Sequence, residues 1–365
     1  MVSLASRSDT MAFDTMAGWE AVNAALAAAR AEVLAAAPDS AIAAEGETYL
    51  MRVLTACLND AFLSHLFTES GLTRVLPVRG GPNPDYKMAV ATLDQTRRYR
   101  LDGWLNNSER VGVGIYSFGP GGSANISSYL AIDRDSLESG FSVDIATDAQ
   151  GPRALAIRPD ARVLMIRILH RDPCGAPARL VLTGGPPFSD LTQAEGNADA
   201  ALRQVAQTLL RSIRSFLEWS AVTSAAVNRF HAETPSMAQT VQGDPDTTYF
   251  LGSFNLQHGE WLEVTMPAGI PGYWSLHAYN YWCESLPGAG VGDDSCITEA
   301  DGTIRIDVGP TAGGDAPNRV DTRGRERGAL ICRFIGAPQV TAPATVVRTA
   351  IKPAEKRGRH ADGHR

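Results

Sequence analysis

The chain has 365 residues and a formal net charge of −7, from 33 Lys and Arg against 40 Asp and Glu. Hydrophobic residues make up 44% of it, which is enough to build a sizeable core in one large domain or two ordinary ones. An acidic body argues against nucleic-acid partners, because non-specific phosphate binding needs a basic surface. The five cysteines are scattered and form no CxxC pair. We therefore expect a cytoplasmic protein with free thiols and no metal site.

The first part of the chain is predicted to be helical. Apolar residues recur every three or four positions in "AGWEAVNAALAAARAEVLAAA" and in "ETYLMRVLTACLNDAFLSHLF", and "PDSA" separates the two runs. The Ala-rich run contains Arg30 and Glu32 and is too short and too polar to cross a bilayer. His65, alone among apolar neighbours, is interpreted as a core residue. Residues 1–75 are thus predicted to form a helical segment without a membrane span.

Two strand-rich regions follow, separated by a helix. Short alternating segments such as "YKMAVATL", "RVGVGIYSF" and "RVLMIRIL" lie between turn residues, at the spacing typical of a sandwich. The intervening helix, with Ser189 or Asp190 as its N-cap, has one apolar face, formed by Leu202, Val205, Leu209, Ile213 and Phe216. We predict an α+β fold, rich in β-sandwich, with two similar antiparallel β units, an N-terminal helical segment and a helical linker. The predicted ranges are 76–187 and 241–337 for the β units, 188–240 for the linker and 338–365 for a disordered basic tail.

Three short matches between the two regions indicate a tandem duplication. They occur in the same order and lie 161, 163 and 166 positions apart. The matched pairs are Asp85 with Asp246, Asp144 with Asp307, and Arg167 with Arg333. A repeated turn favours a structural role for Asp85 and Asp246, since Asn or Asp before Pro bonds its own downstream backbone. Direct contact of Asp85 and Tyr86 with a substrate is the alternative.

Four stretches together resemble a known bacterial family. They are "NPDYKMAVATLDQTRRYRLDG", "YFLGSFNLQHGEWLEVTMPAGIPGYWSLHAYNYWCESL", "DGTIRIDVG" and "NRVDTRGRERGALICRF". In this order they are similar to the proteins catalogued as domain of unknown function 1214, often found beside domain of unknown function 1254. The resemblance runs from about Asn83 to Phe334 and implies a β-sandwich-rich fold with helical additions, without an established chemistry. The chain departs from the family pattern at Arg319, where Trp is usual, and at His277, where Gln or a similar residue is common.

The stretch "GYWSLHAYNYWCESL", residues 272–286, is the densest polar and aromatic cluster. Strand alternation would place one set of side chains on a single face: Tyr273, Ser275, His277, Tyr279 and Tyr281. The opposite face would carry Trp274, Leu276, Ala278, Asn280 and Trp282. Such a composition favours a pocket for a lipophilic or aromatic ligand, and an aromatic ladder on a surface strand is the alternative.

Acid–base chemistry is the reaction type that these residues suggest. His277 titrates near neutral pH when unperturbed, and "NRVDTRGRERGALICRF" supplies Asp321 as a base and Arg333 as an anion clamp. A pairing of Asp321 with Arg333 that locks the last hairpin is the alternative. The predicted catalytic residues are His277, Asp321 and Tyr281. The predicted substrate-binding residues are Arg333, Tyr273, Tyr279, Asn280, Trp282, Asn318, Asp85 and Tyr86.

Signatures of nucleotide and esterase sites are missing from the sequence, which has neither GxSxG nor GxxxxGK[ST]. We therefore expect a cofactor-independent enzyme of the lyase, isomerase or hydrolase type, which acts on a lipophilic or aromatic small molecule. The alternative is a non-catalytic β-sandwich protein that binds a small molecule, a lipid or a carbohydrate. Formation of a homo-oligomer through the helical N-terminus is left open.

Overall fold

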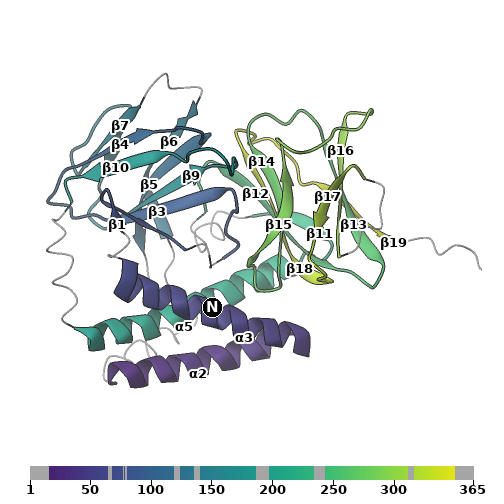
Figure 1. Cartoon of the computed structure of the whole chain (residues 1–365), viewed down its shortest axis with the longest axis horizontal. Helices are drawn as coiled ribbons and strands as arrows, with labels where there is room; N and C mark the ends of the chain where they lie inside the picture. The colour runs from purple at the N-terminus through teal and green to yellow at the C-terminus, as the bar shows by residue number, and fades with distance from the viewer. Residues whose placement is uncertain are drawn as a thin grey trace, which may run out of the picture.

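Two β units lie side by side above a layer of helices in a computed structural model of the chain (Figure 1). The structure describes residues 16–64, 68–76, 78, 80–118, 124–134, 140–185, 197–233, 243–310 and 316–349. None of the helices in these ranges is long and apolar enough to span a bilayer. Several sequence predictions fall outside the described residues, namely those for His65, Ser189, Asp190 and residues 350–365.

The helical layer has three main helices. They are α2 (Gly18–Ala36), α3 (Ser40–Leu58) and α5 (Ala198–Ser224). A short π-helical turn, η1 (Asn59–Leu63), follows α3. The break between α2 and α3 falls at "PDSA", where the Asp39 side chain accepts a hydrogen bond from the backbone N–H of Ile42 at 2.9 Å and so caps α3. Asn197 caps α5 in the same way, accepting from the N–H of Ala200 at 3.0 Å.

The helices pack on one another and on the second β unit through a single apolar cluster. Small side chains on α2 let α5 approach closely; they are Ala21, Ala25 and Ala29. Trp282 enters the cluster from the second β unit, where it stacks on Tyr49 with ring centroids 5.6 Å apart. The Trp282 indole N–H also donates to the carbonyl of Ile42 at 3.1 Å. The helices are therefore fixed against the second β unit by a buried aromatic contact.

The first β unit is a sandwich of two sheets with an apolar core between them. Its six-stranded sheet has the order β1-β2-β3-β9-β5-β6 and its four-stranded sheet the order β10-β4-β7-β8. The bounds are Thr68–Glu69 (β1), Leu72–Arg74 (β2), Tyr86–Thr92 (β3), Tyr99–Trp104 (β4), Arg110–Phe118 (β5), Ala124–Asp133 (β6), Phe141–Ala146 (β7), Ala154–Ala156 (β8), Val163–Leu169 (β9) and Arg179–Thr183 (β10).

The second β unit repeats this arrangement around a second core. Its five-stranded sheet has the order β11-β12-β18-β14-β15, and its four-stranded sheet the order β17-β16-β13-β19. The bounds are Arg229–Ala232 (β11), Thr247–Asn255 (β12), Glu260–Pro267 (β13), Trp274–Tyr279 (β14), Ser285–Gly292 (β15), Thr303–Gly309 (β16), Asn318–Asp321 (β17), Arg327–Ile335 (β18) and Ala344–Thr349 (β19).

Strand order and register correspond between the units. The run β3-β9-β5-β6 matches β12-β18-β14-β15, and β10-β4-β7-β8 matches β19-β13-β16-β17. The pairs β7–β8 and β16–β17 are both parallel. On the central strands, Arg167 lies opposite Met88 and Arg333 lies opposite Tyr249. The predicted α+β fold with two similar β units is thereby confirmed.

The prediction of a disordered tail from residue 338 is wrong for its first part. Ala344–Thr349 forms β19, which pairs antiparallel with Glu260–Thr265 of β13. Most side chains of β19 are exposed, so its order comes from backbone hydrogen bonds at a sheet edge. The apolar pattern that marks a buried strand is therefore missing from this sequence.

Candidate functional site

Each β unit presents a matching turn to the other unit. In the first turn, residues 83–86, the Asn83 side chain accepts from the N–H of Asp85 at 3.1 Å. In the second turn, residues 244–247, the Asp244 side chain accepts from the N–H of Asp246, also at 3.1 Å. The residue before the proline thus folds each turn, as its repetition in the sequence suggests.

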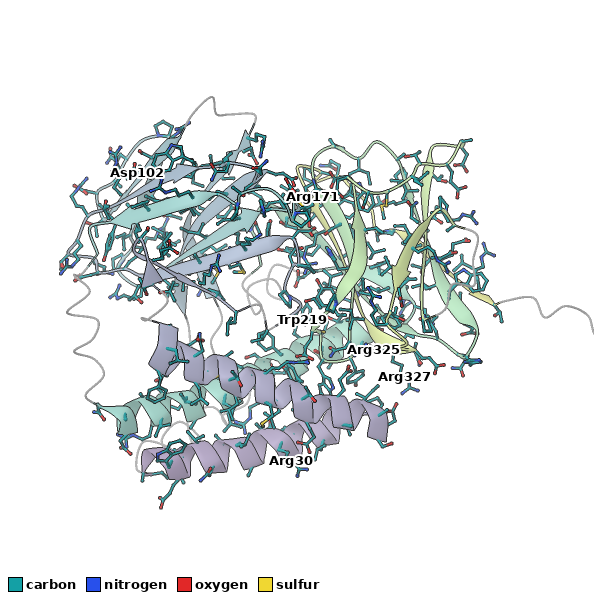
Figure 2. The ribbon with its side chains drawn as sticks, viewed as in Figure 1. Arg30, Asp102, Arg171, Trp219, Arg325 and Arg327 are labelled. Atoms are coloured by element: carbon teal, nitrogen blue, oxygen red, sulfur yellow. The ribbon has the colours of Figure 1, made fainter. Side chains whose placement is uncertain are left out.

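The side chains of Asp85 and Asp246 extend from these turns across the boundary between the units. Asp85 accepts a hydrogen bond from the Tyr273 hydroxyl at 2.7 Å, and Asp246 is ion-paired with Arg110. Arg171 adds a further link, donating to Asp293 at 2.7 Å; Figure 2 labels it at the junction of the two units. These contacts join the two β units through polar side chains, beside a smaller apolar cluster.

A buried arginine lies on the central strand of each unit. Arg167 on β9 and Arg333 on β18 are each 3% exposed. Arg167 donates to the Tyr116 hydroxyl at 2.7 Å, and Arg333 donates to the Tyr279 hydroxyl at 2.8 Å. Tyr116 and Tyr279 stand at matching places on β5 and β14. The duplicated fold therefore builds the same arginine–tyrosine pair twice.

Both arginines line one cavity of about 170 Å³ between the β units and α5. Its apolar wall includes Met88, Met165, Phe216, Trp219, Leu251 and Ile331. Its polar wall includes Tyr86, Glu233, Asp244 and Tyr249. Figure 2 labels Trp219 where α5 passes under the boundary. The volume lies below that of pockets for drug-sized ligands, so the cavity suits a small molecule.

Arg333 is held in this cavity by uncharged partners. Besides the Tyr279 hydroxyl, it donates to the carbonyl of Gly81 at 2.6 Å. Within the described part of the chain, no carboxylate forms an ion pair with Arg333. Gly81 has a φ of 62°, and a Cβ atom there would lie 2.6 Å from Cδ1 of Ile331, so a glycine is needed for this approach. Arg333 is therefore a buried guanidinium whose direct hydrogen-bond partners are uncharged, and the nearby carboxylates act on it only through their charge.

Asp244 organises the polar side of the cavity. It is 3% exposed and accepts hydrogen bonds from the hydroxyls of Tyr86 at 3.0 Å and Tyr129 at 2.8 Å. Its backbone N–H donates to the Tyr249 hydroxyl at 2.8 Å. Burial, followed by the charge of Asp244, raises the pKa of both Tyr86 and Tyr249. These tyrosines are therefore neutral phenols at physiological pH.

Glu233 is the lining group best suited to exchange a proton at neutral pH. Burial raises the pKa of Glu233 to about 7. The indole N–H of Trp219, which donates to Glu233 Oε1 at 3.2 Å, and the charge of Arg333 act in the opposite direction. Both forms of the carboxyl are consequently populated near pH 7, as a general acid or base requires.

The three predicted catalytic residues do not come together, and none of them lines the cavity. His277 is buried with its Nε2 3.8 Å from Asp85 Oδ1, and burial with the nearby Arg333 charge lowers its pKa to about 3, so it is neutral at pH 7. The Tyr281 hydroxyl donates to a carbonyl of α2 at 3.1 Å, because β14 ends two residues earlier. Asp321 is exposed.

The expected pairing of Asp321 with Arg333 is wrong. Asp321 lies at the end of an outer strand, where it forms an ion pair with Arg323 at 3.3 Å. Arg333 belongs to the other sheet of the unit and points toward the Tyr279 hydroxyl and the carbonyl of Gly81. Arg323, two residues further along the chain, is therefore the cation that pairs with Asp321.

Among the predicted substrate-binding residues, Arg333 and Tyr86 line the cavity. The Tyr279 hydroxyl accepts a hydrogen bond from Arg333 outside the cavity lining. Tyr273 and Asp85 bond each other next to the cavity, and burial raises the pKa of Asp85 despite the hydrogen bond from Tyr273. Five of the eight predicted residues thus lie in or beside the cavity.

The remaining three predicted binding residues have structural partners elsewhere. Asn280 donates to Glu284 at 2.8 Å inside the turn after β14. Trp282 packs among the helices. The Asn318 side chain accepts from the N–H of Ile297 at 2.6 Å and donates to the same residue's carbonyl at 2.9 Å, which fixes a loop of the second unit.

Sequence reasoning missed Arg167, Glu233, Asp244, Tyr249 and Trp219 as site residues. Arg167 carried a usable signal, because it matched Arg333 in the repeat and both positions lie in apolar strands. Glu233 carried none, since its burial depends on Trp219 of α5, a helix that ends before it in the chain.

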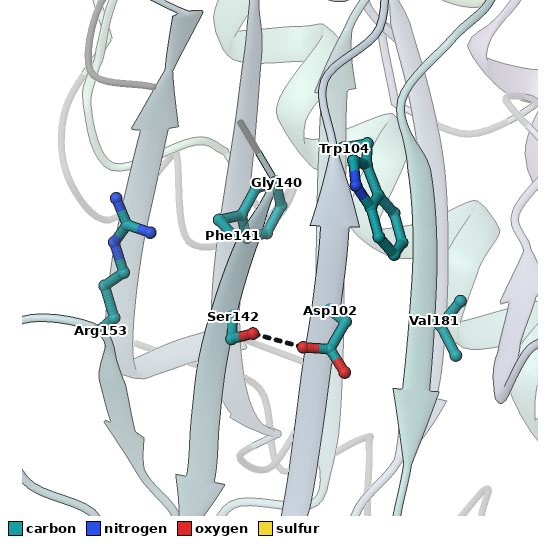
Figure 3. A pocket seen from close by; sticks show the side chains of 7 residues that line it. All are labelled: Asp102, Trp104, Gly140, Phe141, Ser142, Arg153 and Val181. Atoms are coloured by element: carbon teal, nitrogen blue, oxygen red, sulfur yellow. Dashed lines mark hydrogen bonds between the residues drawn. The ribbon is translucent and has the colours of Figure 1, made fainter. Parts of the chain in front are cut away.

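A larger hollow, of about 580 Å³, opens on the outer face of the sheet β10-β4-β7-β8 (Figure 3). Ser142 donates a hydrogen bond to Asp102, which lowers the pKa of that carboxyl. Trp104 is 44% exposed and lies under the Arg179 guanidinium, 5.5 Å from the ring centroid to Cζ. Arg179 is exposed and the Asp102 side chain is 31% exposed, so water screens both charges, unlike those of the interior cavity.

The described residues contain no group of three or more His, Cys, Asp or Glu side chains placed to hold a metal ion.

Comparison with protein families gives a match over residues 227–352 to the family described as "Protein of unknown function (DUF1254)". This range spans the second β unit, where the sequence motifs suggested domain 1214. The comparison supports a relation to domain 1254 and does not show one to domain 1214.

A solved structure of similar fold supports the architecture. An uncharacterized protein from Burkholderia cenocepacia is 24% identical, with 91% of this chain and 97% of that chain covered and a TM-score of 0.77. A protein from Vibrio parahaemolyticus is 12% identical, with 83% and 97% covered, and its TM-score of 0.46 is too low to carry an argument. No curated protein matches the chain. The comparisons thus support the fold of the chain and give no information on its reaction or ligand.

Proposed function

We propose that this protein is a cofactor-independent enzyme that binds a small carboxylate with an aromatic or lipophilic body in the cavity between its β units. The observation that carries the proposal is the buried guanidinium of Arg333, which faces the cavity and has uncharged partners. A ligand carboxylate could accept hydrogen bonds from this guanidinium in place of a protein carboxylate. Arginine suits this role because its planar donors match the two oxygens of a carboxylate.

The walls favour an apolar body on the ligand. Met88, Phe216 and Trp219 offer aromatic and polarizable surface, and Tyr249 adds a hydroxyl to the lining. An acid such as benzoate combines both features at a size that suits the cavity. Long lipids and sugars are less suitable, since the cavity is small and most of its lining is apolar.

Acid–base chemistry is the reaction type that the lining supports. Glu233 can hold or release a proton near pH 7. The neutral Tyr249 hydroxyl accepts from the N–H of Asp244 and keeps its own hydrogen to donate to a developing negative charge. Among the described lining residues there is no Ser, Thr, Cys, Lys or His, so covalent catalysis by those nucleophiles is disfavoured. A lyase or isomerase that moves a proton beside a carboxylate fits best.

A binding protein without catalysis is the second candidate. It is favoured by the same lining, in which Glu233 alone combines a pKa near neutrality with a place on the wall. We also infer a cytoplasmic location from the free thiols, a relation to domain 1214 from the sequence motifs, and a division of the chain near residue 187.

The test is a thermal-shift screen of small acids, followed by mass spectrometry of each incubated mixture. Benzoate and phenylacetate should raise the melting temperature, whereas benzyl alcohol should not. The matched variants are Arg333→Met, which should lose the shift, and Arg100→Met on the exposed outer face, which should keep it. An acid that is bound and converted supports the enzyme. One that is bound and returned unchanged supports the binding protein, and a shift that survives in Arg333→Met overturns the site.

A further inference from the structure

The charges around the cavity balance before any ligand enters. Arg167 and Arg333 contribute two formal positive charges, and Asp244 and Glu233 contribute two negative ones. These four are the charged side chains among the described lining residues. Addition of one carboxylate would leave a buried excess of negative charge, which is costly in a site with little water.

We propose that the cavity binds a small monocarboxylate together with one proton, and that Glu233 carries this proton. This inference rests on the proposed function, because it assumes a carboxylate ligand. Protonated Glu233 leaves the two arginines with a net positive charge that one carboxylate neutralises. It also gives the site a hydroxyl that can donate a hydrogen bond to the ligand.

The surroundings of Glu233 make it the group that takes the proton. Its carboxyl accepts from the indole N–H of Trp219 at 3.2 Å and interacts with the charge of Arg333. Its backbone N–H donates to the carbonyl of Tyr249 at 3.0 Å. The titratable and charged groups that line the same cavity from the packed elements are Arg333 of β18, Tyr249 of β12, Arg167 of β9, Tyr86 of β3 and Asp244 of the second turn.

Asp244 is the less suitable acceptor for this proton. Its oxygens already accept hydrogen bonds from the hydroxyls of Tyr86 and Tyr129, and a proton on either oxygen would disturb one of them. Among the described residues, Trp219 is the side chain that donates to Glu233, at 3.2 Å to Oε1, and Oε2 is left to take a proton. Its pKa of about 7 means that little free energy is needed to protonate it near neutral pH.

Binding should therefore weaken as the pH rises. Glu233 is protonated in the free protein below about pH 7, and a bound anion next to it raises its pKa further. Affinity is then fully present below pH 7 and declines as the pH rises toward the pKa of the complex. We expect the Kd for benzoate to increase about tenfold or more between pH 6 and pH 8.5. Benzoate itself is ionised throughout this range.

The experiment is isothermal titration of full-length protein with benzoate and with phthalate, its dicarboxylate analogue. At pH 8, the binding enthalpy should differ between phosphate and Tris buffers. The difference should equal the difference in ionisation enthalpy of the two buffers multiplied by about one proton taken up per benzoate. Glu233→Gln mimics the protonated carboxyl, so its Kd should not change with pH and its proton uptake should vanish. Phthalate should bind the wild-type protein more weakly than benzoate does.

Each result decides the inference. Benzoate binding that is independent of pH, without proton uptake in the wild-type protein, overturns the proton and leaves the carboxylate site in place. Phthalate binding as tight as that of benzoate overturns the monocarboxylate. Failure of the wild-type protein to bind benzoate at any pH overturns this inference together with the proposed ligand class. Because the wild-type titrations suffice for these outcomes, the test survives a Glu233→Gln protein that does not fold.

Discussion

Replacement of Glu233 by Gln should stabilise the ligand-free protein at alkaline pH and have little effect at acidic pH. Burial raises the pKa of Glu233 from 4.5 to about 7. Between these two values the unfolded chain releases a proton that the folded protein keeps, so the free energy of unfolding falls as the pH rises. Above pH 7 both states are ionised and the loss is complete.

The magnitude follows from the two pKa values. A change of one pKa unit corresponds to about 1.4 kcal/mol, so the difference between 4.5 and 7 is worth about 3 kcal/mol. Gln keeps the size of the side chain and can still accept the hydrogen bond from Trp219. We therefore expect Glu233→Gln to gain about 2–3 kcal/mol over wild type at pH 8, relative to the difference between them at pH 4.5.

Urea unfolding at pH 4.5, 6 and 8, followed by circular dichroism, measures this effect. The slope of unfolding free energy against urea should be the same in both proteins, since the surface exposed on unfolding does not change. Glu218→Gln is the control, because it removes one carboxylate from the exposed side of α5. If Glu233→Gln and wild type differ equally at pH 4.5 and pH 8, the buried environment assigned to Glu233 is wrong.

Three further predictions concern the boundary between the units. Wild-type His277 has a pKa of about 3, so below pH 6.5 the unfolded chain binds a proton at this residue that the folded protein does not bind. The free energy of unfolding should therefore fall less steeply in His277→Gln than in wild type, by about 2 kcal/mol between pH 6.5 and 4.5. A parallel fall in both proteins would refute this. Gly290→Ala should lower the free energy of unfolding in urea by about 1–3 kcal/mol, because the added Cβ would overlap the His277 ring. The control Gly185→Ala, at an exposed bend, should leave it unchanged. Equal decreases in the two variants would exclude the overlap. Trp219→Phe removes the N–H that lowers the pKa of Glu233, so the pH at which benzoate affinity falls should rise, and an unchanged profile would count against that bond.

The sequence predicts what depends on neighbouring residues. The two turns follow from Asn83 and Asp244, each of which precedes a proline and bonds the backbone two residues later. Strand alternation places Tyr273 and Tyr279 toward the boundary and Trp274 toward the sandwich core. The similar β units follow from residues that match at regular spacing.

Failures occur where a contact joins distant parts of the chain. Strand alternation predicts that Tyr281 shares a face with Tyr279, but β14 ends at Tyr279. The chain turns there, and Cys283 has a φ of 56°. Glu233 gains its altered pKa from burial against α5 and the second unit, and its flanking sequence gives no sign of this. Asp321 carries the right charge for Arg333 and lies on the wrong sheet.

The central claim is that the buried arginines form an anion site between the β units. Isothermal titration of benzoate at pH 6 into wild type, Arg167→Met, Arg333→Met and the outer-face control Arg100→Met tests it most directly. We expect Arg333→Met to bind benzoate about tenfold more weakly or worse, because a charge-assisted hydrogen bond is lost, and Arg100→Met to bind like wild type. Benzoate binding of wild-type strength in a protein that carries both Arg167→Met and Arg333→Met would contradict it.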